Sequence, residues 1–302
     1  MIYPANFEQK VGFDGLREEV AALCTIRGGR ERLCAEQFST SQADVERRLA
    51  LADEMRRLLE MEHDFPDDEF VDVDYILSKL KIEGSFLEVE EVVLLRRALA
   101  SAGAIAGFIL GRGEELYPEL RLRSRGIEAF PEIVRAIRDD ASPELQQIRR
   151  MILEREGQAA KRLQQVLSNA KKAGIVEADA MLSIRDGRAV IPVAAANKRK
   201  LQGFIHDESA TGKTFYVEPV EVVEINNELK ELEYAERREI VRILSAFTDS
   251  IRPEADRIAL IGEYLSDLDM IRAKARWAVA NGAVKPIVST DDRLVLRNAR
   301  HP

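Results

Sequence analysis

The sequence predicts a mainly α-helical protein with a long antiparallel two-helix arm and a small inserted antiparallel β-sheet. Two segments, 142–174 and 219–252, keep helical periodicity along their whole length but carry only a narrow apolar stripe. Such helices are too long for a compact bundle of this size, so the economical arrangement pairs them antiparallel. The residues between them, 175–218, change to the two-residue alternation of strands. The flanking residues, 1–141 and 253–302, are expected to form a helical core.

The first part of the core is predicted to consist of helices joined by short connections. In SQADVERRLALADEMRRLLE, Ser41 is a candidate N-cap and apolar residues recur at helical spacing from Val45 onward. FLEVEEVVLLRRALASAGAIAGFIL predicts another helix from about Leu87. Carboxylates in such helices fall on solvated faces far more often than they form an acid/base pair, so we expect no catalytic residue in this part. The chain should return to helix in EYLSDLDMIRAKARWAVANG and reach a strand in DRLVLRNARHP.

The two arm helices have readable ends. Ser142 can accept from the free N–H groups of the first turn, and Pro143 suits that turn because its missing donor costs nothing there. Gly174 ends the run, which corresponds to about 46 Å of helix at about 1.5 Å per residue. The second helix is expected to begin near Pro219 and to end before Pro253.

Two β-hairpins are predicted between the arm helices. MLSIRDGRAVIPV places Asp186 and Gly187 in a two-residue turn, which is the strongest short-range hairpin signal. Pro192 lacks a ladder donor, so we expect its strand at an edge of the sheet. GFIHDESATGKTFYVEP supplies the second hairpin.

The Gly-Lys-Thr sequence of that second hairpin ends like a nucleotide-binding loop. Such a loop needs a further glycine five positions before its Gly-Lys pair, where this chain has Asp207. The residues from Thr214 to Val217 are β-branched or aromatic and favour a strand over a helix N-terminus. We therefore expect a turn carrying Ala210, Thr211 and Gly212, and no ATP site.

Composition indicates a globular chain. Of its 302 residues 46% are apolar, and it shows neither a run of eighteen apolar residues nor a leader-like amino terminus, so we expect a cytoplasmic protein without a membrane contact. Cys24 and Cys34 are expected to be buried free thiols, and three scattered histidines indicate no metal site.

The charge of the chain is unevenly distributed. The net charge is −8, yet residues 143–200 hold twelve Lys or Arg against six Asp or Glu. That local excess indicates either an anionic partner or a basic solvated face.

The order of these segments, with five motifs, resembles the MutS family, and most closely its second bacterial branch, endonuclease MutS two. The motifs are ASPELQQIRR, IRDGRAVIPVAAANKRK, GFIHDESATGKTFYVEP, VEINNELKELE and IRAKARWA. The resemblance implies a core, a lever made of the two arm helices and a clamp made of 175–218. It also implies that the polypeptide would continue past His301 and Pro302 into an ATPase domain and a small nuclease domain, so that this chain is an excised piece. Because the amino terminus enters the core directly, we expect no mismatch-reading domain and no connector domain.

The resemblance further implies that the parent protein is an ATP-driven dimeric clamp around a nucleic-acid structure. Its missing ATPase would use ATP and Mg²⁺, and the lever would pass movement between that ATPase and the clamp. Two targets stay open: branched DNA, in the suppression of homologous recombination, and stalled or collided ribosomes. For this chain itself we expect no cofactor and no catalysis.

The candidate phosphate contacts are the basic residues of the expected clamp: Arg185, Arg188, Lys198, Arg199, Lys200 and Lys213. Arg185 and Arg188 should face each other across the Asp-Gly turn, an arrangement of like charges that makes sense if a phosphate lies between them. The three cations at 198–200 are expected close to the same end. Six acidic residues share this segment, so neutralisation within the chain is the alternative. No aromatic residue is interleaved for stacking, so we expect contact with the nucleic-acid backbone without sequence preference.

A second class of function stays open. The arm could serve as a protein-interaction scaffold that mediates dimerisation or docks a partner, with basic residues that only keep it soluble. Steep salt dependence of binding to a duplex or to ribosomes would favour the clamp. A concentration-dependent mass without nucleic-acid affinity would favour the scaffold.

Overall fold

The computed structural model describes residues 6–67, 70–127, 130, 142–185, 187–290, 293–297 and 299–300. The chain divides into two compact units: unit 1 comprises Met1–Arg138 and Leu244–Pro302, and unit 2 comprises Asp139–Ile243. The described part is mainly helical with one four-stranded antiparallel sheet, which confirms the predicted fold class at this level.

Unit 1 is helical in its described residues. Its helices are α1 (Phe7–Lys10), α2 (Phe13–Ala21), α3 (Arg27–Ala35), α4 (Gln42–Met61), α5 (Asp74–Leu80), α6 (Val89–Leu110), α7 (Pro118–Ser124), the last turns of α10 (Val220–Ile251), the 3-10 turn η2 (Arg252–Glu254) and α11 (Ala255–Asn281). The helices predicted after Ser41 and from about Leu87 are confirmed as α4 and α6. Ser41 caps α4, because its Oγ accepts from the backbone N–H of Asp44 at 3.4 Å.

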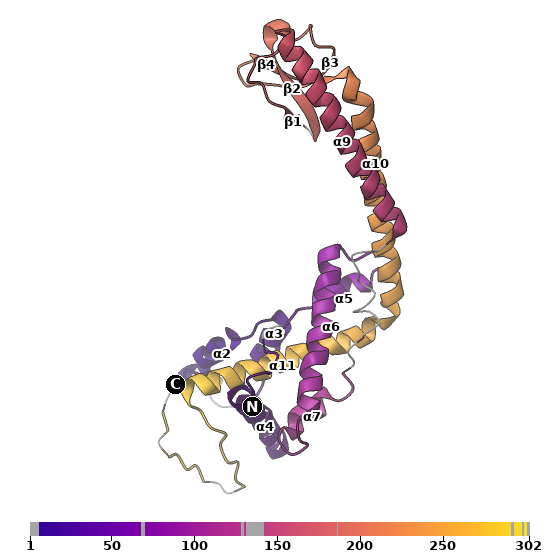
Figure 1. The fold of residues 1–302 in the computed structure, drawn as a ribbon. Coiled ribbons are helices and arrows are strands. Elements are labelled where there is room, and N and C mark those ends of the chain that lie inside the picture. The colour runs from indigo at the N-terminus through magenta and orange to yellow at the C-terminus, as the bar shows by residue number, and fades with distance from the viewer. Residues whose placement is uncertain are drawn as a thin grey trace. The chain divides into compact units, whose positions relative to one another are not determined.

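Helix α11 is the central helix of unit 1, and it packs along α3, α4 and α6 (Figure 1). Its buried Asp269 carboxylate accepts from the backbone N–H groups of Thr25 and Ile26 at 2.8 and 3.0 Å. Arg272, 2% exposed, pairs with Asp269 at 2.8 Å and with Asp67 at 3.0 Å. These bonds tie the loop before α3 and the chain before α5 to one helix. Loss of Arg272 would leave the buried Asp269 carboxylate without its cation, which is costly in a low-dielectric interior.

Helix α6 is long and apolar enough to cross a bilayer by length and composition alone. Half of its most apolar stretch is buried within the protein, and Leu95, Leu99, Ile105 and Ile109 are completely buried. This burial describes a core helix of unit 1.

Two expectations for unit 1 need correction. Both cysteines are free, and burial, assisted by the charge of Asp269, raises the pKa of the half-buried Cys24 thiol to about 11, but Cys34 is exposed rather than buried. Residues 293–297 form no strand. A strand needs a neighbour to complete its ladder of hydrogen bonds, and none of the described strands pairs with this segment. The predicted motif also includes His301 and Pro302, which lie outside the described residues.

Unit 2 contains two long helices and the sheet that separates them in sequence. Its elements are α9 (Pro143–Lys172), β1 (Ser183–Arg185), β2 (Arg188–Ala194), the 3-10 turn η1 (Ala195–Asn197), β3 (Gly203–Glu208), β4 (Thr214–Pro219) and the greater part of α10, up to Ile243. Ser142 caps α9 as predicted, because its Oγ accepts from the backbone N–H of Leu145 at 3.0 Å. Gly174, with a left-handed φ of 65°, follows the end of α9.

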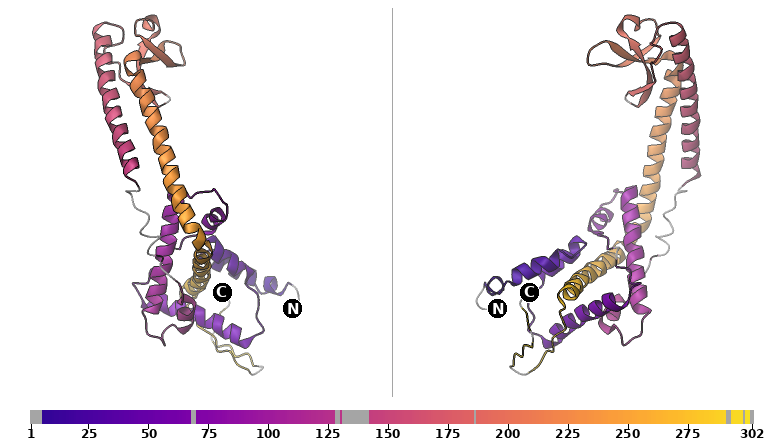
Figure 2. Two further views of the ribbon diagram at one scale, coloured as in Figure 1. Left: turned by 90° about the vertical axis from the view of Figure 1, so that its right-hand side faces the viewer. Right: turned by 60° about the vertical axis from the view of Figure 1, so that its left-hand side comes forward.

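Helices α9 and α10 lie side by side and run antiparallel (Figure 2). Three polar contacts join them within unit 2: Ser142 with Glu239 at 2.7 Å, Arg149 with Glu236 at 2.7 Å, and Arg155 with Glu228 at 2.8 Å. From one contact to the next, the residue in α9 comes later in the chain and its partner in α10 comes earlier. The two helices therefore run antiparallel.

One face of the sheet is buried against the end of α9 and the start of α10. The buried cluster contains Leu163, Val166, Leu167, Ala170, Val176, Ile191, Val193, Val217 and Val222. Inward residues of β2 and β4 thus meet one stripe of α9, which removes apolar surface from water and holds the sheet on the helix pair.

The strand order is β1-β2-β4-β3, so β2 is an inner strand and the edge position predicted for Pro192 is wrong. The ladder with β1 ends at Val190, and Pro192 faces Tyr216 of β4. Proline is tolerated here because β1 does not extend to its position, so no second neighbour needs the donor that it lacks.

Candidate nucleic-acid interface

The predicted facing pair, Arg185 and Arg188, closes the β1–β2 ladder. The two residues are register partners, and Gly187 between them has a left-handed φ of 73°. Asp186, the other predicted turn residue, lies outside the described residues. Arg185 Nε donates to Asp207 at 2.9 Å, and Arg188 is held by a buried glutamate. Each arginine therefore has an anion within the chain, which explains how two like charges can stay opposite each other.

That glutamate is Glu218 of β4, which is only 1% exposed. It accepts from Arg188 Nη1 at 2.8 and 3.0 Å and from Asn226 Nδ2 at 2.6 Å, and it lies 2.6 Å from Nε2 of His206 in the bulge of β3. Burial acts to raise the pKa of the Glu218 carboxyl, but the bonds from Asn226, His206 and Arg188 outweigh burial and hold the pKa below its ordinary value. Glu218 therefore stays charged at neutral pH and fixes Arg188 to the sheet.

Aromatic rings lie under two of the predicted contacts. The Arg185 guanidinium is 3.9 Å from the ring centre of Tyr216, and the Lys198 ammonium is 4.4 Å from that of Phe215. The sequence shows no aromatic interleaved with these cations, and the two rings come from β4, which follows them in the chain. Phe215 and Tyr216 are adjacent in β4, so their side chains point to opposite faces of the sheet and each meets a different cation. The rings hold cations of their own chain, which leaves them less free to stack on a base.

Lys198, Arg199 and Lys200 lie in the connection from β2 to β3. This connection is anchored at its start, because Asn197 Nδ2 donates to the Ile175 carbonyl at 3.0 Å. All three basic side chains are exposed, and no carboxylate within the described part of the chain forms an ion pair with them. They are therefore available to an external anion.

The Gly-Lys-Thr segment forms the predicted hairpin turn between β3 and β4. The Gly212 N–H donates to the Ser209 carbonyl at 2.7 Å, and the Thr214 N–H donates to Ser209 Oγ at 3.1 Å. Because β4 begins at Thr214, the segment does not fit a nucleotide phosphate loop, which must open a helix. Lys213 is exposed, and its carbonyl accepts from the Ala195 N–H at 2.8 Å, which places this turn beside the β2–β3 connection.

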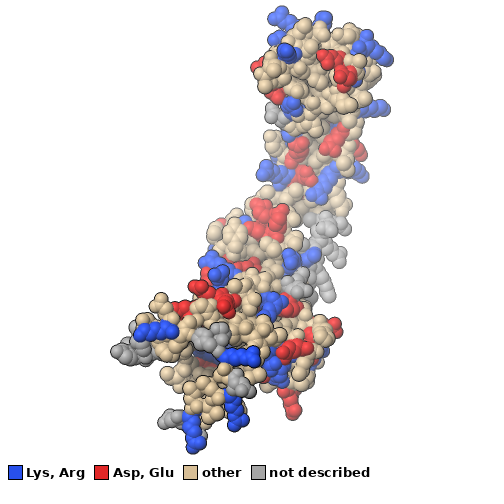
Figure 3. Space-filling model, turned by 90° about the vertical axis from the view of Figure 1, so that its left-hand side faces the viewer, with Lys and Arg blue, Asp and Glu red and all other residues tan. Residues whose placement is uncertain are grey.

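The predicted contacts fall at two ends of β2 and form two groups. The turn arginines, Arg185 and Arg188, lie at its start, and the loop cations lie beyond its end: Lys198, Arg199, Lys200 and Lys213. The seven-residue strand separates them by about 20 Å at about 3.3 Å per residue. The expectation that 198–200 lie close to the turn arginines is therefore wrong. Figure 3 shows Lys and Arg around the end of unit 2 that carries the sheet, with acidic side chains among them.

Sequence reasoning missed the polar network of Glu218, His206 and Asn226. These residues come from two strands and a helix and meet only through the pairing of β3 with β4 and the turn into α10, so no local spacing announces them. The candidate contacts at both ends of β2 can offer an anionic partner hydrogen-bond donors and positive charge. Among the described residues, no group of three His, Cys, Asp or Glu side chains could hold a metal ion.

Comparison with known proteins gives relatives but no match to a family model. The chain is similar to "Endonuclease MutS2" of Lacticaseibacillus paracasei, with 30% identity over 301 residues that cover 96% of the chain and 38% of the relative. It is also similar to the protein of that name in Pelotomaculum thermopropionicum (31% over 304 residues, 97% and 38%) and in Alkaliphilus oremlandii (31% over 297 residues, 92% and 36%). The chain thus spans about 38% of the length of the curated relatives that it matches.

Proposed function

The chain belongs to the MutS family, in its MutS2 branch, and from this membership we propose that unit 2 is a nucleic-acid clamp. In this proposal residues 175–218 are the clamp that touches the nucleic acid, and α9 and α10 are the lever that carries it. The ribbon of Figure 2 supports the division, because the sheet lies at one end of the paired helices.

The observation that carries the proposal is the state of the loop cations. Lys198, Arg199 and Lys200 are exposed on a short connection of a packed sheet, and no carboxylate among the described residues pairs with them. Lys and Arg so placed neutralise backbone phosphates and fix a protein on a strand without reading its sequence. Lys213 joins them from the neighbouring turn.

The turn arginines have a smaller part in this function. Arg188 donates to Glu218 and also to Asn227 Oδ1 at 3.1 Å, so its main effect is to keep the sheet in shape. Arg185 is paired with Asp207, but its side chain is 35% exposed. A phosphate between the two arginines must compete with these carboxylates, so we rank this contact below those of the loop cations.

Two targets suit such a surface: double-stranded or branched DNA, and the RNA of a stalled or collided ribosome. Both present phosphates in a duplex, and the loop cations make no distinction between them. In the whole protein, the clamp acts in a homodimer that is driven by an ATPase using ATP and Mg²⁺ and that carries an endonuclease. The name of the relatives, endonuclease MutS2, is consistent with the last of these activities.

The test compares the two targets with the same protein at the same salt concentration. Binding of a four-way DNA junction is followed by fluorescence anisotropy, and binding to ribosomes by co-sedimentation. Salt-dependent binding to either target that weakens when Lys198, Arg199 and Lys200 are changed to Ala supports the clamp. Absence of binding to both targets refutes it.

One observation favours the scaffold as a second candidate. A shallow groove of about 480 Å³ lies beside the β3 edge of the sheet and is lined by Phe204, Val220, Val223, Glu224, Asn227, Glu228 and Glu231. Phe204 is 60% exposed, and Glu224 and Glu231 are exposed as well. Sedimentation velocity over a range of protein concentrations tests this candidate. A mass that rises with concentration, and that Phe204→Ser abolishes, would favour the scaffold, whereas a constant mass counts against self-association.

A further inference from the structure

A pocket of about 420 Å³ in unit 1 is bounded by α3, α4, α7 and α11. Its apolar lining includes Leu51, Ala52, Met270 and Ile271. Gln37 and eight charged side chains line most of the rest, and the charged side chains belong to two separate networks. The volume lies within the range of about 300–1,000 Å³ that is typical of pockets for small ligands.

The first network is built on Asp267 of α11. Arg32 of α3 pairs with this carboxylate at 2.8 Å, and Arg123 of α7 pairs with its other oxygen. Two guanidinium groups thus share one carboxylate, which leaves an excess of one positive charge. The like charges of Arg32 and Arg123 repel, so a further anion between them would be stabilised.

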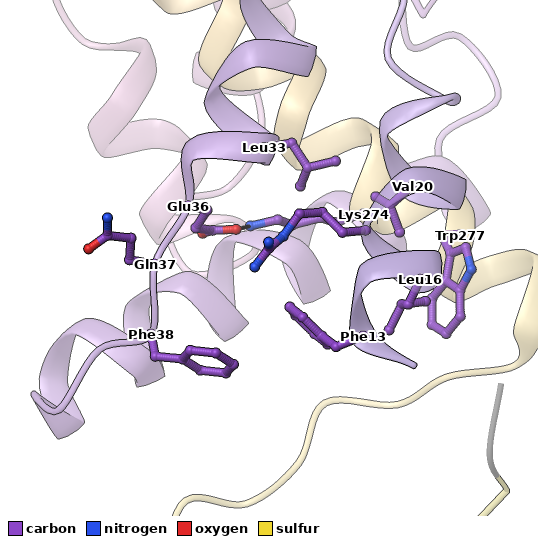
Figure 4. A pocket seen from close by; sticks show the side chains of 10 residues that line it. Phe13, Leu16, Val20, Leu33, Glu36, Gln37, Phe38, Lys274 and Trp277 are labelled. Carbon is purple, nitrogen blue, oxygen red and sulfur yellow. Dashed lines mark hydrogen bonds and ion pairs between the residues drawn. The ribbon is translucent and has the colours of Figure 1, made fainter. Parts of the chain in front are cut away.

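The second network is a chain of alternating cations and carboxylates that runs from α4 past the end of α3 to α11. Arg47 and Arg48 share Asp44 at 2.8 and 2.6 Å, and Arg48 also reaches Glu36 at 3.5 Å. Lys274 completes the chain by pairing with Glu36, and Figure 4 shows these two side chains meeting. Three cations share two carboxylates here, so this network also begins and ends on a cation and has an excess of one positive charge.

The two networks together leave two positive charges in excess among the described residues that line the pocket. Arg32, Arg47 and Arg123 each make one side-chain ion pair here, although a guanidinium has five N–H donors. A phosphate monoester carries about −1.5 to −2 at pH 7 and offers three strong acceptor oxygens, whereas a phosphodiester in a nucleic-acid strand carries one negative charge. We propose that this pocket binds a phosphate monoester group, with its organic part against the apolar lining.

The monoester can come from a small phosphorylated molecule or from the 5′ end of a nucleic-acid strand, since both present the same group. This site goes beyond the proposed clamp, because it lies in the other unit and takes a terminal phosphate instead of a backbone. Failure of one proposal therefore leaves the other standing.

The first experiment titrates the 302-residue chain with inorganic phosphate at constant ionic strength and slightly alkaline pH, followed by ³¹P NMR. A saturable change in the phosphate resonance is expected. Arg32→Gln and Arg123→Gln should each weaken binding about tenfold, as should Arg47→Gln in the other network, because each removes charged hydrogen bonds to the anion. The matched control is Arg56→Gln, since Arg56 also lies on α4 and is paired, with Asp53 and Glu60, but does not line the pocket.

Arg47 is 53% exposed, so its replacement should leave the fold intact, and a melting curve of each variant checks this point. If phosphate binding is not saturable, or if Arg56→Gln lowers the affinity as much as the three pocket variants, the site does not exist. If Arg32→Gln unfolds the chain, the Arg47→Gln titration still decides.

The second experiment identifies the source of the phosphate by competition. It uses the variant in which Lys198, Arg199 and Lys200 are Ala, so that the proposed clamp contact is weakened. Displacement of inorganic phosphate by glycerol phosphate alone identifies a small-molecule site. Displacement by a 5′-phosphorylated oligonucleotide, but not by its 5′-hydroxyl counterpart, identifies a strand end. Equal displacement by both oligonucleotides, or displacement by none of the three, shows that the pocket is not selective for a monoester and overturns the assignment.

Discussion

Replacing Lys198, Arg199 and Lys200 together by Ala should flatten the salt dependence of nucleic-acid binding. Each phosphate that is neutralised on B-DNA contributes about 0.9 to the slope of log K against log salt. All three cations are exposed, although Lys198 also contacts the Phe215 ring at 4.4 Å and can be partly retained there. The expected loss of slope is therefore about 1.8 for two contacts and about 2.7 for three.

The assay is fluorescence anisotropy of a labelled duplex at several salt concentrations. Between about 50 and 200 mM salt, the Kd of the unchanged chain should weaken about 10- to 40-fold more than that of the variant. A second duplex of different sequence should give the same difference, because the loop cations contact phosphates and not base edges.

The control replaces Lys10, Lys81 and Arg96 of unit 1 by Ala. Like the triple variant, it removes two lysines and one arginine that are exposed and have no ion-pair partner among the described residues. If this control lowers the slope of log K against log salt as much as the triple variant at 198–200 does, any exposed cation contributes equally. The nucleic acid then has no specific contact with the β2–β3 connection. A changed sequence preference in the loop variant would instead indicate base contacts.

Three further predictions concern unit 2. Glu218→Gln should destabilise it by about 2 kcal/mol, because Arg188 would lose its negatively charged partner and one amide oxygen cannot replace both carboxylate oxygens as acceptors. Since the folded-state pKa of Glu218 is lowered, its contribution to stability is complete above the ordinary value of 4.5 and is lost as the pH falls below it, so melting curves of the variant should depend less on pH in that range. Isothermal titration with Mg-ATP should show no saturable binding, and saturable binding that Lys213→Ala abolishes would contradict the hairpin assignment. In limited proteolysis, trypsin should cleave after Arg199 or Lys200 before it cleaves after Lys161, because the helical backbone of α9 resists cleavage; the reverse order would refute this ranking.

The ends of the helices could be predicted from the sequence because their signals are local. Ser142 and Ser41 each accept from a backbone N–H three residues ahead, which the sequence states directly. The hairpins could also be predicted, since turn residues and strand alternation lie within a few positions of each other. The strand that we expected near the end of the chain was wrong. Its sequence has strand propensity, but propensity does not say whether a partner strand lies beside it.

The order of the strands could not be predicted from such signals. β4 inserts between β2 and β3, and this long-range pairing decides which strand is inner and which cations share an end. The edge position predicted for Pro192 was wrong because a proline only lacks one backbone N–H. An inner strand tolerates this where one of its neighbours has already ended, and β1 ends before it reaches Pro192. The placement of 198–200 beside the turn arginines failed because sequence proximity was taken for proximity across a seven-residue strand.

The charge of the clamp segment shows why pairing matters more than net charge. Residues 175–218 contain six basic and six acidic side chains, so counting predicts a neutral surface. In the structure, Asp207 and Glu218 are bonded to the turn arginines, whereas Glu177, Asp179 and Glu208 form no ion pair with a loop cation in the described part of the chain. The loop cations therefore keep their donors for an external phosphate, while the acidic residues nearby weaken long-range attraction. Binding by this chain alone should consequently be weak and short-ranged. Added salt should weaken the few direct phosphate contacts more than it lowers the rate of encounter with the nucleic acid.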